Sequence, residues 1–148
     1  MADTTQSAKS PWHLWVVGAV SLLWNAMGVL DFTMTQTRNE AYLKQCTPEQ
    51  LAYVYDVPFW VLLTWGVGTW GSGLGSLLLL LRNGLAVPLF FASFIGMVFT
   101  FTYNYVFSDW LKVMGGGVGN LIFSGVIFVI ALLLLVYARA MRRRGALR

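Results

Sequence analysis

Four long apolar stretches, separated by short polar segments, dominate the chain. They cover residues 14–34, 58–81, 85–107 and 118–138. Each is roughly 20 residues or longer, which is the length a helix needs to cross a hydrocarbon core about 30 Å thick. Backbone groups in lipid must bond within their own segment, so helices are expected. The pattern therefore predicts an all-α integral membrane protein, a bundle of four transmembrane helices.

Composition supports this class. The chain has 148 residues, of which 57% are hydrophobic and 11% charged, whereas about a quarter of the residues of a soluble domain are charged. We expect a single membrane domain over residues 1–148, with an external loop at 35–57 and a basic cytoplasmic tail at 139–148. The expected spans lie at about 12–34, 58–81, 85–107 and 118–139.

The predicted external loop contains a helix-start signal, "TPEQLAYVY". Thr47 suits the N-cap, Pro48 the first helical position, and Gln50 the capping-box position. An apolar face follows, formed by Leu51, Val54 and Tyr55. These features predict a short interfacial helix at the outer membrane surface.

The placement of basic residues predicts the orientation. With both termini in the cytoplasm, three basic residues lie outside, namely Arg38, Lys44 and Lys112. Seven then lie inside, namely Lys9, Arg82, Arg139, Arg142, Arg143, Arg144 and Arg148. The opposite orientation inverts this ratio, so we expect a multi-pass membrane protein with both termini in the cytoplasm.

The net charge of +4 comes mainly from the tail "RAMRRRGALR". A basic patch can bind nucleic acid, but beside a membrane span it is more typical of a topology anchor in contact with anionic lipid. The expected partners are therefore the lipid bilayer and anionic lipid at Arg142, Arg143 and Arg144, without nucleic acid. Association with itself or with another membrane protein remains open.

Residues 66–71 read "GVGTWG", the glycine spacing of a dinucleotide-binding turn. Such a turn needs a preceding strand and an acidic residue about 20 positions later. Here the glycines lie inside an uncharged block of spanning length, so a nucleotide cofactor is not expected. With one histidine and one cysteine, Cys46, the chain also has no evident catalytic or metal-binding set, and we expect a non-enzymatic protein without a cofactor or metal.

Read as a helix, the same region has stripes of small residues. Gly68 and Ser72 recur at a spacing of four, and Gly71 and Gly75 form a G-x-x-x-G pair beside them. Such stripes allow another helix to approach closely. A second stripe on a different face is formed by Gly66 and Gly73. The second long helix is therefore expected to be central, and its small residues serve packing within the chain or, alternatively, self-association.

Polar residues within the predicted spans concentrate in the outer half of the membrane. The candidates for a polar pocket are Asn25, Asp31, Arg38, Thr64, Thr100, Asn104 and Asn120. They indicate either an outward-facing pocket or a polar cluster that locks the outer helix ends together. Asp31 is the central residue: it is either satisfied by Arg38, Thr35 or loop amides, or it binds a proton or a substrate.

Several stretches resemble a family of small, four-span bacterial inner-membrane proteins, which are often labelled "sugar transporter". They include "PWHLWVVGAVSLLWNAMG", "DFTMTQTRNEAYL", "TPEQLAYVY" and "IFVIALLLLVYARAMRRRG". The resemblance implies a location in the bacterial inner membrane, and two functions follow as expectations. The first is a non-enzymatic accessory or interaction component of the membrane. The alternative is a small oligomeric transporter, of sugar if the label applies, with an outward-facing polar pocket around Asp31.

Overall fold

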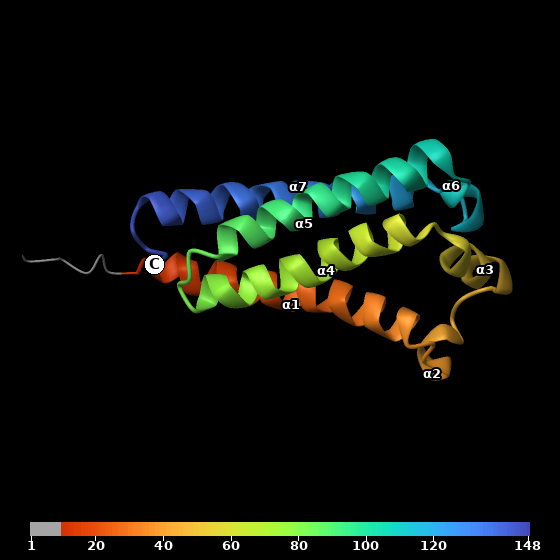
Figure 1. Cartoon of the computed structure of the whole chain (residues 1–148), viewed down its shortest axis with the longest axis horizontal. Helices are drawn as coiled ribbons and strands as arrows, with labels where there is room; N and C mark the ends of the chain where they lie inside the picture. The colour runs from red at the N-terminus through yellow and green to blue at the C-terminus, as the bar shows by residue number, and fades with distance from the viewer. Residues whose placement is uncertain (1–9) are drawn as a thin grey trace, which may run out of the picture.

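The computed structural model describes residues 10–148, and every regular element in this part of the chain is a helix. Lys9, which contributes to the orientation argument, lies outside the described residues. Four long helices run along the long axis of the molecule (Figure 1). They are α1 (Trp12–Gln36), α4 (Phe59–Leu80), α5 (Ala86–Thr102) and α7 (Val118–Arg143). A π-helical turn, η1 (Tyr103–Phe107), continues α5.

The two ends of the bundle differ. Three short helices lie at one end, which we call the short-helix end: α2 (Glu40–Leu43), α3 (Pro48–Asp56) and α6 (Trp110–Val113). The C-terminus lies at the other, which we call the C-terminal end (Figure 1). Each long helix begins within one residue and ends within four residues of a predicted span, when η1 is counted with α5.

The long helices pack in the order α1, α4, α5, α7. The most extensive contact joins α4 to α5, followed by α1 to α4 and α5 to α7. The central position expected for the second long helix is therefore confirmed. Gly68, Gly71 and Gly75 face α5, whereas Gly66 and Gly73 face Phe32 and Val29 of α1. The small residues of α4 thus serve packing within the chain on both of its sides.

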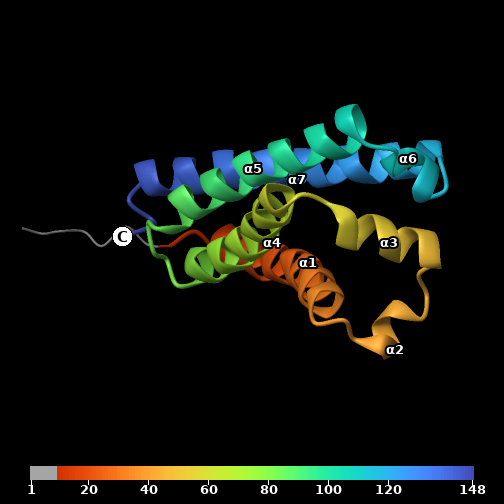
Figure 2. The same cartoon turned by 45° about the vertical axis from the view of Figure 1, so that its right-hand side comes forward.

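Three helical segments are long and apolar enough to cross a membrane: Trp12–Gln36, Ala86–Phe107 and Val118–Arg143. Helices α3 and α4 meet the same criterion only when taken together, and they are bent by 98° at the break between them, so the described residues hold three such segments, or four if this bent pair is one span. Figure 2 shows α3 turning away from α4 toward α6. The break contains Pro58, which has no amide hydrogen to continue α3 and is suited to the start of α4.

The start of α3 follows its sequence signal. Thr47 Oγ1 accepts a hydrogen bond from the Gln50 amide at 3.2 Å, and Gln50 Oε1 accepts one from the Thr47 amide at 3.1 Å. The predicted capping box is therefore confirmed. The chain reverses before this point at Arg38, whose φ of 53° lies in the left-handed region, and Asn39 then caps α2 by accepting from the Tyr42 amide.

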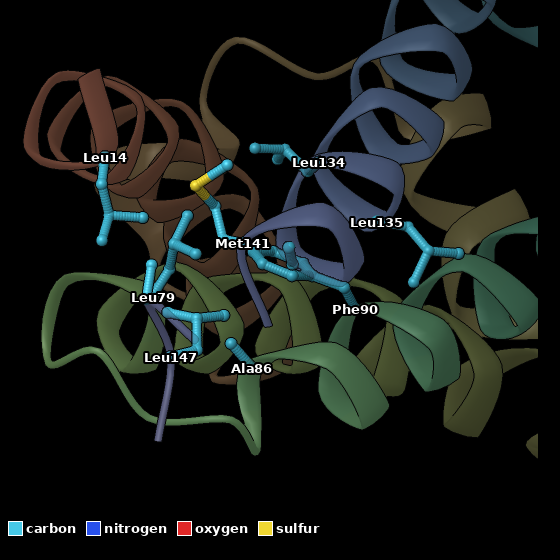
Figure 3. Close-up of a cluster of buried hydrophobic side chains, with 10 residues drawn as sticks. Leu14, Leu79, Ala86, Phe90, Leu134, Leu135, Met141 and Leu147 are labelled. Carbon is cyan, nitrogen blue, oxygen red and sulfur yellow. The ribbon is translucent and has the colours of Figure 1, made fainter. Parts of the chain in front are cut away.

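A buried hydrophobic cluster closes the C-terminal end. Leu14 and Leu79 are fully buried, and Figure 3 shows their side chains converging with that of Leu147. The whole cluster consists of Leu14, Leu79, Ala86, Phe90, Leu134, Leu135, Ala138, Met141, Ala146 and Leu147. Residues from α1, α4, α5 and α7 therefore meet the last residues of the chain in one core.

The segment predicted as a basic tail, residues 139–148, is partly helical and partly folded back onto the bundle. Helix α7 continues to Arg143, and Gly145, with φ of 73°, turns the chain back. The Arg148 amide then donates to the Arg82 carbonyl at 2.8 Å, and the Gly84 amide donates to the Arg148 carbonyl at 2.6 Å. The segment after α7 is docked against the α4–α5 connection, because Ala146 and Leu147 complete the core there.

Candidate functional site

A cavity of about 500 Å³ lies between the four long helices. It is partly open, and α2 contributes Tyr42 to its wall. Apart from Tyr42, its polar lining residues are Asn25, Asp31, Thr64, Thr69, Ser72, Ser93 and Thr100. Its apolar and glycine lining residues are Trp24, Met27, Gly28, Trp65, Gly68, Phe90, Met97, Phe101, Phe123, Ile127, Ile130, Ala131 and Leu134. The volume lies within the range of sites that hold drug-sized molecules.

Helical periodicity explains how this surface arises. On α1 the lining positions are 24, 25, 27, 28 and 31, and on α7 they are 123, 127, 130, 131 and 134. Spacings of three and four place these residues on one face of each helix. The α7 wall is entirely apolar, whereas α1, α4 and α5 carry the polar groups. Phe90 and Leu134 also belong to the buried cluster, which therefore forms the floor of the cavity.

Asn25 joins α1 to α4 beside the floor. Its Nδ2 donates to Ser76 Oγ at 2.8 Å and to the Ser72 carbonyl at 3.3 Å. Ser76 is fully buried, so the amide satisfies a hydroxyl that water does not reach. This is interhelical hydrogen bonding, which in membranes contributes about 0.6–2 kcal/mol.

Two further polar contacts join α4 to α5. Thr64 Oγ1 and Thr100 Oγ1 lie 2.9 Å apart, and Ser93 Oγ donates to the Gly68 carbonyl at 2.6 Å. Ser93 and Thr100 are buried. The polar stripe of the cavity therefore also holds the two central helices in register.

Asp31 lines the cavity and is exposed, as are Met27 and Phe123, and we call the part of the opening at Asp31 the mouth. The Tyr42 hydroxyl donates a hydrogen bond to Asp31 Oδ1. The partners suggested by the sequence are different: the Arg38 guanidinium lies 4.4 Å from the centroid of the Tyr55 ring, and the Thr35 carbonyl accepts from the Tyr55 hydroxyl at 2.7 Å. The turn at Arg38 directs the Arg38 side chain to α3, so Arg38, one of the alternative partners considered for Asp31, does not pair with it.

Three of the candidate residues do not line the cavity. Arg38 is held by α3, as described. Asn104 accepts from the Tyr53 hydroxyl at 2.9 Å, and Asn120 donates from Nδ2 to the Met114 carbonyl at 2.9 Å. Asn104 and Asn120 therefore stabilise connections at the short-helix end, and Asn120 satisfies a backbone carbonyl at the end of α6. Asn25, Asp31, Thr64 and Thr100 are brought together, as are Gly68 and Ser72 from the packing stripe.

The sequence argument missed Tyr42, Thr69 and Ser93 as members of this site. A signal for Ser93 is present, since residues 93, 96, 97 and 100 share one face of the third span. No comparable signal exists for Tyr42, because its position depends on the turn between α1 and α2.

The fold and cavity define an all-helical bundle with an amphipathic internal site. A scan of protein-family models and searches of curated proteins and of solved structures found no match for this chain. The resemblance to the family of four-span proteins therefore stays a prediction.

The Tyr42–Asp31 bond leads to a pH-dependent prediction. Donation to the carboxylate raises the pKa of Tyr42 to about 12, and burial and the negative charge act in the same direction. Because the folded-state pKa lies above the ordinary value of 10.0, the stability contributed by this group is complete below pH 10 and is lost as the pH rises toward 12. In a phenolate absorbance titration, Tyr42→Phe should remove a component with a midpoint near 12. Loss of a component near 10 would contradict this assignment.

Proposed function

We propose that the protein is a non-enzymatic membrane protein that binds an amphipathic small molecule in the cavity between its four long helices. The observation that carries this proposal is the cavity itself, with hydroxyl and amide groups on three walls and an apolar fourth wall on α7. Sites for small molecules combine an apolar lining with a few placed polar groups in this way. Such a site would serve uptake or transport of the ligand across the membrane.

The packing of α4 favours this function over a purely accessory one. A Cβ at Gly71 would lie 3.2 Å from Ser93 Cβ, and a Cβ at Gly75 would lie 3.0 Å from the Phe90 ring. Both glycines are occupied by α5 of the same chain. The G-x-x-x-G pair is therefore not available for docking a partner helix.

The proposed setting is the bacterial inner membrane, with four spans, α3 at the outer surface, and both termini in the cytoplasm. The excess of basic residues at the C-terminal end supports this orientation. Arg142, Arg143 and Arg144 are exposed, which suits contact with anionic headgroups. The mouth of the cavity at Asp31 would then open toward the outer side.

A cavity-filling variant tests the proposal. A Cβ at Gly28 meets Thr69 Cγ2 at 3.7 Å, an ordinary contact, so a larger side chain can grow from the cavity wall there. We expect Gly28→Phe to weaken binding of tetraphenylphosphonium and of the neutral triphenylphosphine oxide at least about tenfold. Binding is measured by equilibrium scintillation proximity with protein in lipid nanodiscs, and empty nanodiscs give the baseline.

Gly125→Phe is the matched control, since a Cβ at Gly125 has no neighbour within 4 Å and Gly125 does not line the cavity. It should bind both probes as the unmodified protein does. Circular dichroism establishes that both variants keep their helices. The proposal fails if the unmodified protein binds neither probe, or if the two variants lose binding equally; stoichiometric foreign subunits after mild extraction would then favour the accessory function.

A further inference from the structure

We propose that the cavity selects organic cations, with the cationic centre at Asp31 and the apolar body among the aromatic rings below it. This inference rests on the proposed function and adds the charge class of the ligand. Among the described residues that line the cavity, Asp31 is the one with a formal charge. The site therefore carries a net negative charge at its mouth when Asp31 is ionised.

The basic residues of the short-helix end do not neutralise this charge. They are Arg38, Lys44 and Lys112. Arg38 lies over the Tyr55 ring, Lys112 pairs with Asp109 at 3.0 Å, and no ion pair joins Lys44 to Asp31 in the described part of the chain. The neutral Tyr42 hydroxyl is the hydrogen-bond partner of Asp31, and it leaves the charge of the carboxylate in place. A carboxylate in this position favours a cationic partner.

Aromatic rings extend the same preference into the cavity. Trp24 of α1 and Phe123 of α7 pack against each other at the cavity, with their ring centroids 6.4 Å apart. Trp65 and Phe101 also line the cavity. The faces of such rings attract cations, most strongly for indole. An organic cation with an apolar body can contact both the carboxylate and these rings, whereas an anion is disfavoured by both.

The residue types also distinguish an organic cation from a metal ion. No group of three or more histidine, cysteine, aspartate or glutamate side chains suitable for a metal lies in the described part of the chain. Hard metal ions need several oxygen ligands in a compact shell. One carboxylate, from Asp31, one phenol and a largely apolar cavity suit a bulky, weakly hydrated organic cation better than a metal ion.

The test compares three phenyl-bearing probes, with four rings in each ion and three in the neutral oxide. They are the cation tetraphenylphosphonium, the neutral triphenylphosphine oxide and the anion tetraphenylborate, each measured in nanodiscs after subtraction of empty nanodiscs. We expect the cation to bind at least about tenfold more tightly than the neutral probe, and the anion to bind more weakly than either. Asp31→Asn should remove most of the advantage of the cation while binding of the neutral probe stays within about twofold.

Asp31→Asn suits this purpose because its amide oxygen can still accept the Tyr42 hydrogen bond. If the neutral probe binds as tightly as the cation, or if Asp31→Asn leaves the preference intact, the inference is overturned while the proposed function stands. If no probe binds to the unmodified protein, or if Gly28→Phe fails to reduce binding, the proposed function itself fails. A preference for tetraphenylborate would overturn the inference directly.

Discussion

Gly96→Leu is expected to separate α4 from α5 and to lower the free energy of unfolding more than Leu147→Ala does. A Cβ at Gly96 would lie 2.7 Å from the Thr64 carbonyl oxygen and 3.2 Å from the Gly68 amide nitrogen. Both are backbone atoms of α4, so relief requires one helix to move as a unit. Overpacking of this kind typically costs about 1–3 kcal/mol, and a backbone clash belongs at the upper end.

The measurement is equilibrium unfolding in mixed micelles, followed by circular dichroism. Gly125→Leu on α7 is the matched control, because a Cβ there has no neighbour within 4 Å. The control should be as stable as the unmodified protein or slightly more stable, since leucine favours helix over glycine by about 1 kcal/mol. Equal free energies of unfolding for the two variants would show that α4 and α5 do not approach as closely as described.

Leu147→Ala is expected to lower the free energy of unfolding by about 2–3 kcal/mol. Leu147 is 5% exposed and packs with Leu14 and Leu79 in the buried cluster. Truncation leaves a cavity where the returning segment meets the bundle. The backbone bonds of Arg148 to the α4–α5 connection should weaken with it, because they depend on the same docking.

Unfolding in mixed micelles gives the stability, and the rate of trypsin cleavage among the arginines at 142–144 reports docking of the segment. Leu133→Ala on α7 is the control, since Leu133 is 60% exposed and its truncation should change stability by less than about 0.5 kcal/mol. Faster cleavage is expected for Leu147→Ala alone. Similar stability and cleavage for the two variants would mean that the segment after α7 is not held in the core.

The candidate site could be predicted only in part from the sequence. Asn25, Asp31, Thr64 and Thr100 were recognisable as polar residues at unfavourable positions, and the structure gathers all four around the cavity. The hydrogen-bond partners of these four residues could not be predicted from the sequence. Tyr42 reaches Asp31 because the chain reverses at Arg38 in a left-handed conformation that is uncommon for arginine. That reversal also carries Arg38 away to Tyr55.

The conformation of the C-terminal segment could also be predicted only in part from the sequence. Its arginines indicate contact with water and lipid headgroups, and Arg142 and Arg143 are indeed exposed. Ala146 and Leu147 are too few to form an apolar pattern of their own. They are buried because Gly145 turns them back onto a core that the other helices have already built.

The number, position and approximate ends of the long helices can be predicted from the sequence alone. These properties follow from local chemistry: apolar stretches of spanning length, Pro58 at a break, and Thr47 with Gln50 at a cap. The folded structure is needed to show which helix faces meet, where the cavity lies, which residue holds Asp31, and where the chain end docks. These depend on the crossing of helix surfaces and on two left-handed turns, at Arg38 and Gly145, so they arise from contacts between residues far apart in the sequence.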